Sequence, residues 1–287
     1  MSAKWLRLLW LALGAGAVML LAPLLGGTPI NLQRALDFSI PRADNYDAIL
    51  LFDLRFARVI FAAVVGAALG VAGCAFQVAL RNPLATPYTL GVSSAASLGA
   101  LLVLLVLGPG WFVVVGGLTA GLLCTGLVLV LARMLSGWQG TVSLLLAGVT
   151  LNTLFGAAIL LLQYLADPTQ TFTMIRWLMG ALDVAGMQTG LLLGAACGAV
   201  MVAMILQTPA MNLLTLDDLS ARTLGIDPDR TRIWLMMLAS VLAALVVSFA
   251  GPIGFVGLIV PQAARRVLGE DHRVLLPSIP DRFEIKS

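Results

Sequence analysis

Residues 54–100 read LRFARVIFAAVVGAALGVAGCAFQVALRNPLATPYTLGVSSAASLGA and decide the architecture of the chain. The segment from Val59 to Leu80 contains no Asp, Glu, Lys, Arg or His. About 20 such residues suffice to cross a hydrocarbon core about 30 Å thick. Arginines stand on both sides of this segment, and a polar turn separates it from a second apolar stretch rich in Gly and Ser. The pattern predicts a membrane hairpin.

The composition of the whole chain also indicates a protein that crosses a membrane several times. Of its 287 residues, 60% are hydrophobic and 11% are charged, whereas a soluble domain carries about 25% charged residues. The formal net charge is +3, but the basic residues are scattered at the ends of apolar stretches. We therefore expect membrane lipid, and no nucleic acid, beside these charges.

Apolar stretches predict an all-α, polytopic membrane helix bundle with eight spans. The excess of Lys and Arg in alternate loops places the N-terminus in the cytoplasm. The first stretch is longer than the apolar region of a signal peptide, so we expect a retained span. The stretches lie at 8–25, 59–80, a Gly/Ser-rich segment ending at 100, 111–132, 142–165, 187–206, 233–250 and 253–264.

Several classes of chemistry are absent from the sequence. Lysine occurs only at Lys4 and Lys286, so the chain has no GxxxxGK[ST] phosphate loop and cannot be an ATP-hydrolysing subunit. The single histidine, His272, excludes HExxH and multi-histidine metal sites. We expect no catalytic site, no metal site and no cofactor in this chain. The spans contain essentially no ionisable residues, which counts against a secondary transporter driven by an ion gradient, although that alternative stays open.

The polar loop at 208–232 carries helix-capping signals. Thr215 is predicted to cap a helix whose first turn contains Asp217 and Asp218, because acidic side chains favour the positive end of a helix. Gly225 suits the C-terminal cap of that helix, and Asp227 followed by Pro228 suits the start of the next helix. The pattern predicts a short amphipathic helix from Thr215 to Leu224 at the cytoplasmic surface. An ordinary connecting helix is the alternative.

Three ordered motifs connect these features to a known family. The first combines LRFAR at 54–58, Gln77, RNPLATP at 81–87 and LGVSS at 90–94; the others are LLLAGVTLN at 144–152 and GPIGFVGLIVPQAAR at 251–265. Together they resemble the permease subunits of binding-protein-dependent ABC importers for iron-siderophores, haem and vitamin B12. The resemblance implies a multi-pass protein of the bacterial cytoplasmic (inner) membrane. It also implies three kinds of partner: ABC ATPase subunits that bind ATP and Mg²⁺, an extracytoplasmic substrate-binding protein, and a second permease copy in a homodimer or pseudo-dimer.

The resemblance also assigns roles to residues. Arg55 and Arg58 would dock the binding protein, although simple anchoring at the membrane interface explains them equally well. The ATPase-coupling loop would comprise Thr215, Asp217, Asp218, Leu219, Ser220, Ala221, Arg222, Leu224 and Gly225. Polar residues expected to face the dimer axis and line the translocation path are Gln77, Ser93, Ser94, Ser97 and Asn152, with hydrogen bonds between helices as the alternative.

The C-terminal residues differ from the family pattern. Relatives continue for roughly two more helices, ten in all, whereas this chain ends in the polar sequence SIPDRFEIKS. We therefore expect an incomplete permease domain at 1–277 followed by an unrelated tail at 278–287, as a truncated or frameshifted reading frame would give. A non-transporting remnant or a membrane interaction subunit is the alternative function.

Overall fold

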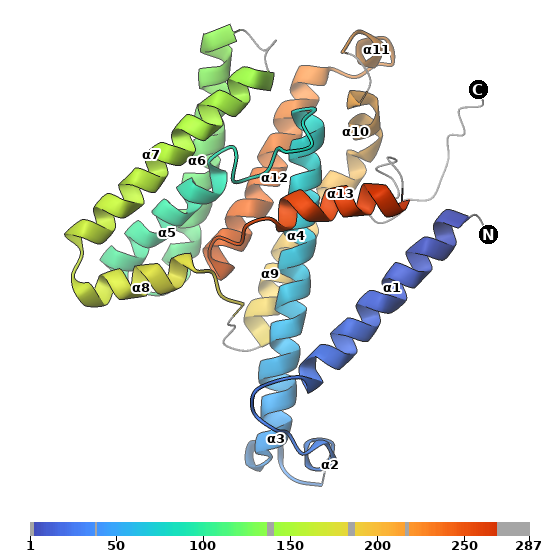
Figure 1. The fold of residues 1–287 in the computed structure, drawn as a ribbon, viewed down its shortest axis with the longest axis vertical. Helices are drawn as coiled ribbons and strands as arrows, with labels where there is room; N and C mark the ends of the chain where they lie inside the picture. The colour runs from blue at the N-terminus through green and yellow to red at the C-terminus, as the bar shows by residue number, and fades with distance from the viewer. Residues whose placement is uncertain (1–2, 38, 137–140, 183–186, 216–217, 269–287) are drawn as a thin grey trace.

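The computed structural model describes residues 3–268 apart from 38, 137–140, 183–186 and 216–217, and every regular element in these ranges is helical (Figure 1). The predicted tail at 278–287 and His272 lie outside the described residues. The elements are α1 Ala3–Leu21, η1 Ala22–Leu24, α2 Leu32–Ala35, η2 Arg42–Asp44, α3 Tyr46–Ala48, the π-helix η3 Ile49–Phe56, α4 Ala57–Ala79, α5 Val92–Leu107, α6 Trp111–Ser136, α7 Thr141–Leu165, α8 Pro168–Leu178, α9 Met187–Leu206, α10 Thr208–Leu214, α11 Asp218–Thr223, α12 Pro228–Ala250 and α13 Val256–Leu268.

The eight predicted apolar stretches all form helices, which confirms the all-α membrane bundle. Five helices in the described part are long and apolar enough to cross a membrane, namely Tyr46–Ala79, Trp111–Ala132, Ser143–Leu165, Met187–Leu206 and Pro228–Ala250. The apolar helices Leu9–Leu24 and Val92–Leu107 are shorter. Helix α13 has 13 residues, which gives a length of about 20 Å and is less than the hydrocarbon thickness.

Helix α4 is the central element of the bundle. It packs against α12, α13 and α9, and α13 crosses it in Figure 1. Together with α3 and η3, α4 forms one continuous helix of 34 residues from Tyr46 to Ala79. Its length of about 50 Å exceeds the thickness of a hydrocarbon core, about 30 Å. The small helices α2 and α3 lie at one end of this rod, and α10 and α11 lie toward the other (Figure 1). We call these the Arg55 end and the Arg81 end.

Glycines allow the closest helix contacts in the bundle. A Cβ atom added at Gly73 of α4 would lie 1.9 Å from the carbonyl oxygen of Gly257 in α13. One added at Gly99 of α5 would lie 2.4 Å from the carbonyl oxygen of Gly116 in α6. At both positions the backbones themselves are in contact, so only glycine fits, as expected where helices associate by close packing in lipid.

The glycines spaced every fourth residue behave differently from one another. Gly117 and Gly121 of α6 face Ser248 and Ala244 of α12, with distances of 2.1 and 2.8 Å from an added Cβ. These two glycines allow close packing inside the bundle. Gly198 of α9 has no atom within 4 Å of such a Cβ, so it makes no close contact here.

Candidate functional site

The loop at 208–232 folds into two short helices. Helix α11, Asp218–Thr223, lies within the predicted helix from Thr215 to Leu224, whereas α10, which has a proline in its first turn, was not predicted. Thr215 is the C-terminal cap of α10, and its hydroxyl donates to the carbonyl oxygen of Asn212 over 2.6 Å. Its predicted role as an N-cap is therefore wrong. Asp217 lies outside the described residues.

The other predicted caps of this loop are confirmed. Gly225 follows α11 with a φ of +90°, a conformation that glycine adopts without a steric penalty. The amide of Ile226 donates to the carbonyl oxygen of Ala221 over 3.2 Å. The Asp227 side chain accepts from the first amides of α12, and Pro228 begins that helix.

Asp218 is the centre of a group of charges that joins three helices. Its Oδ1 lies 2.6 Å from Arg81 Nη2 and 2.8 Å from Arg232 Nη2. Arg81 follows α4, Asp218 begins α11 and Arg232 belongs to the first turns of α12. Arg81 Nε also donates to the carbonyl oxygen of Leu214, the last residue of α10, over 3.0 Å. We call Arg81, Leu214, Asp218 and Arg232 the Asp218 joint.

The charge of Asp218 is stabilised by these partners. Partial burial acts to raise the pKa of its carboxyl, but the hydrogen bonds and charges of Arg232 and Arg81 outweigh burial and hold the pKa below its ordinary value. Arg232 is the more buried partner, with 12% of its side chain exposed, against 34% for Arg81. The carboxylate therefore stays ionised at neutral pH.

Helix α11 exposes apolar side chains on its outer side. Leu219 is 74% exposed and Leu224, just after the helix, is 56% exposed, whereas Ala221 is completely buried. Arg222 of α11 pairs with Asp229 of α12 over 2.9 Å. The helix is thus fastened to the bundle by charge and presents leucines away from it.

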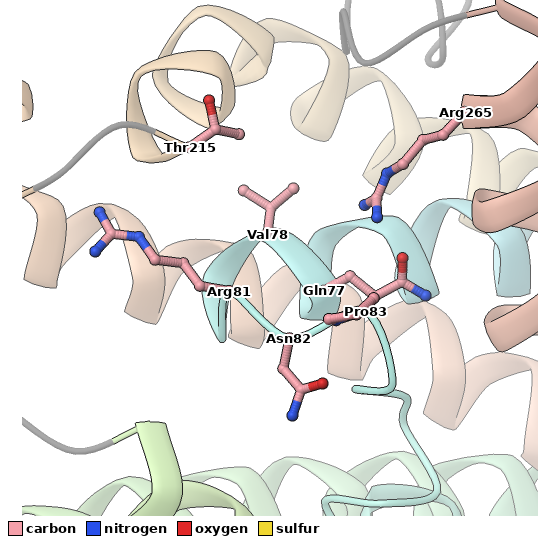
Figure 2. A pocket seen from close by; sticks show the side chains of 7 residues that line it. All are labelled: Gln77, Val78, Arg81, Asn82, Pro83, Thr215 and Arg265. Carbon is pink, nitrogen blue, oxygen red and sulfur yellow. The ribbon is translucent and has the colours of Figure 1, made fainter.

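The turn after α4 borders a cavity of about 260 Å³ beside the Asp218 joint. Arg81 has a φ of +45°, which turns the chain sharply at the end of the helix. The Asn82 side chain accepts from the amide of Leu84 over 2.9 Å, which confirms its prediction as a turn former. Figure 2 shows Arg81 and Arg265 on opposite sides of Val78, with the Gln77 amide near Arg265.

The predicted path residues divide into two groups. Ser94 of α5 donates to Asn152 Oδ1 of α7, so these two side chains do meet. Ser93 and Ser97 are 0% and 1% exposed and lie inside the bundle, whereas Gln77, 3% exposed, borders the cavity beside the Asp218 joint. That these three side chains face a dimer axis stays a prediction. Successive residues of a helix point about 100° apart, which allows Ser94 to face α7 while its neighbours point inward. The alternative role, hydrogen bonding between helices, fits Ser94 and Asn152.

Arg55 and Arg58 line a common cavity of about 400 Å³ at the Arg55 end of the rod. Arg55 belongs to the π-helix η3 and Arg58 to α4, so no single regular α-helix carries both. The Arg55 guanidinium donates to the carbonyl oxygens of Pro23 and Thr28. A Cβ added at Gly26 would lie 2.6 Å from that guanidinium, so the glycine makes room for it.

Sequence reasoning missed Arg81 and Arg232 as parts of the site. The hydrogen bond from Arg81 to Leu214 joins residues 133 positions apart, and spacing along a chain carries no information on such a contact. Arg81 was visible only as a charge that marks the end of a span. The only signal in the sequence was that Asp218 stands at a predicted helix start, in a loop that also carries three arginines.

Comparisons with known proteins agree with this arrangement. Residues 13–279 match the FecCD transport family. The cobalamin import permease BtuC of Halobacterium salinarum is 36% identical over 263 residues, covering 88% of this chain and 69% of that protein. The hemin transport permease HmuU of Yersinia pestis is 36% identical over 231 residues, covering 78% and 69%. A solved ABC transporter of metal-chelate type, in an inward-facing conformation, has a TM-score of 0.82 and 26% identity over 96% of this chain and 85% of its own.

The helical membrane bundle and these matches define a multi-pass transport permease. The chain belongs to the FecCD transport family, whose members among the relatives above are permease subunits of ABC importers. This confirms the family that the three sequence motifs indicated.

Proposed function

We propose that this chain carries a large metal chelate across the bacterial cytoplasmic membrane, with an iron-siderophore as the leading cargo and haem or a cobalamin as alternatives. The relatives named for cobalamin and hemin support this class of cargo. The metal belongs to the cargo, and the chain itself supplies neutral polar groups such as Ser94 and Asn152 between α5 and α7. Neutral groups hydrate a passing chelate without holding it.

The observation that carries the proposal is the exposed leucine surface of α11, formed by Leu219 and Leu224. A charged network fixes this helix to α4 and α12, so it moves with them. We assign it to dock on a separate ATPase subunit, which binds ATP and Mg²⁺ and supplies the energy. The Arg81 end and the N-terminus then lie on the cytoplasmic side, as the Lys and Arg distribution predicts.

The Arg55 end then faces the extracytoplasmic side, where a substrate-binding protein delivers the cargo. Arg55 and Arg58 place two positive charges in one cavity, and complementary charges steer the encounter of two proteins. A second permease copy completes the path in a homodimer or pseudo-dimer.

Uptake into proteoliposomes tests the proposal. The chain is reconstituted with an ATPase and a binding protein of the same importer class, and three probes are supplied separately: an iron-loaded hydroxamate siderophore, haemin and cyanocobalamin. We expect ATP-dependent uptake of one probe, with the siderophore first, and none with an ATPase variant that cannot hydrolyse ATP. Uptake driven by an ion gradient without the ATPase would instead establish a secondary transporter. No uptake of any probe, with the partners bound, would establish an interaction subunit.

A further inference from the structure

Arg81 connects the turn after α4 to the end of α10 and to the start of α11. Arg81 Nε donates to the carbonyl oxygen of Leu214, which ends α10, and Arg81 Nη2 lies 2.6 Å from Asp218 Oδ1, which begins α11. The planar guanidinium presents its donors in a fixed fork, so two such bonds fix an orientation as well as a distance. The end of α10, the start of α11 and the turn are therefore held together.

The carboxylate of Asp218 is also held from the opposite side. Arg232 binds both of its oxygens, with Nη2 2.8 Å from Oδ1 and Nη1 3.3 Å from Oδ2. Helix α11 has six residues, too few to be stable without tertiary contacts. Its position therefore depends on Asp218 and on the buried Ala221.

The turn after α4 leads onward into the bundle. Gln262 Nε2 of α13 donates to the carbonyl oxygen of Pro83 over 3.0 Å. Asn82 holds the shape of the turn through its bond from the amide of Leu84. A displacement of Arg81 thus reaches α4, the turn and α13 through direct contacts.

We infer that Asp218, paired with Arg81, is the positioning residue through which movement of α11 is passed to the turn after α4 and to α13. The inference rests on the proposed docking of α11 on the ATPase. In this role α11 and the turn move as one body when the ATPase closes. Arg222 and Asp229 hold α11 to α12, whereas the Asp218–Arg81 contact joins α11 to α4.

Asp218→Asn and Asp229→Asn form a matched pair of variants. Both changes remove one carboxylate charge that Arg232 contacts, and both keep the shape of the side chain. The Asp218 change removes the negative charge paired with Arg81, whereas the Asp229 change removes the one paired with Arg222. Arg81→Gln removes the other member of the Arg81–Asp218 pair. It replaces Asp218→Asn in the experiment if that variant folds poorly.

The experiment uses the full chain in nanodiscs with its ATPase and binding protein. Spin labels are placed at Thr223→Cys and Leu84→Cys, both exposed, and their separation is measured by double electron–electron resonance without nucleotide and after vanadate trapping. We expect the unaltered chain and Asp229→Asn to keep one narrow distance in both states. Asp218→Asn and Arg81→Gln should broaden the distribution and let it change with nucleotide.

ATP hydrolysis supplies a second readout that a purely structural role would not move. We expect Asp218→Asn to lower the stimulation of hydrolysis by the binding protein about tenfold, a typical size for breaking one member of a shared network. The double variant with Arg81→Gln should be no worse than either single variant. Equal behaviour of Asp218→Asn and Asp229→Asn in both readouts would overturn the inference. Neither readout needs the cargo, so a wrong cargo leaves the test intact, and an unaltered chain that fails to stimulate the ATPase counts against the proposed function instead.

Discussion

The two ends of α4 both carry arginines, but the arginines have different partners. At the Arg55 end, the Arg55 guanidinium donates to the carbonyl oxygens of Pro23 and Thr28. At the Arg81 end, the Arg81 guanidinium pairs with the carboxylate of Asp218. Carbonyl oxygens are neutral and leave a positive charge in place, whereas a carboxylate cancels it.

This difference separates two kinds of task on one rigid helix. A fixed but uncancelled charge attracts an acidic partner surface from a distance. A cancelled charge attracts little from outside and instead holds two segments of the same chain together. Arg55 and Arg81 lie about 40 Å apart along this helix, so the bundle between them decides whether the two ends act together.

The largest expected effect comes from breaking the packing between the two ends. Gly73→Ala would place a Cβ 1.9 Å from the backbone of Gly257, and backbone cannot move aside as a flexible side chain can. We expect a loss of about 1–3 kcal/mol, toward the upper limit, measured by thermal unfolding in detergent. Gly66→Ala on the same helix is the matched control, because nothing lies within 4 Å of its added Cβ. Equal melting temperatures for the two variants would contradict the close contact.

A change of charge at the Arg55 end should weaken docking in a salt-dependent way. We expect Arg58→Glu to slow association with the binding protein about tenfold at low ionic strength, and the effect to shrink in about 0.5 M salt, because salt screens exposed charges. Surface plasmon resonance at several salt concentrations measures this.

Arg55 tests separately whether charge or backbone contact matters at this end, because its guanidinium also donates to backbone carbonyl oxygens. Arg55→Gln keeps a donor for the carbonyl oxygens of Pro23 and Thr28 but removes the charge. We expect slower docking with unchanged resistance of the 23–28 segment to proteolysis. Faster proteolysis with normal docking would show that Arg55 is only a structural residue.

The smallest expected effect is a pH dependence at the Arg81 end. The folded state lowers the pKa of Asp218. The resulting stabilisation of the folded state is therefore present above the pKa of this carboxyl in the unfolded chain, about 4, and is lost as the pH falls through its pKa in the folded chain. A spin label at Thr223→Cys should therefore have constant mobility from about pH 8 to about pH 5 and become more mobile only below about pH 4. Asp218→Asn should give the mobile spectrum at every pH. Loosening near pH 6 would contradict the assignment.

Much of the fold could be predicted because it depends on local composition. The apolar stretches gave the helices, and the caps at Gly225 and Asp227 were found from residue type alone. The role of Thr215 was misjudged because helix α10, which Thr215 ends, was not predicted. The closest contact, between Gly73 and Gly257, was not found because it joins distant parts of the chain.

The candidate site was less predictable for the same physical reason. Asp218 was identified by its position at a helix start, but its partners Arg81 and Arg232 come from other helices. Ser93 and Ser97 were expected on a path because they are polar, and the structure buries both. Polarity shows that a side chain needs a partner, and only the packing of α5 shows where it points.

Site-specific photo-crosslinking tests most directly whether the two ends of α4 serve two different partners. A photoreactive amino acid is placed at position Leu219, which is 74% exposed, or at position Arg58 in the cavity at the other end. The complex is assembled from purified ATPase and binding protein. We predict that the probe at 219 captures the ATPase alone and the probe at 58 captures the binding protein alone. Capture of the binding protein from position 219, or of the ATPase from position 58, would contradict the account.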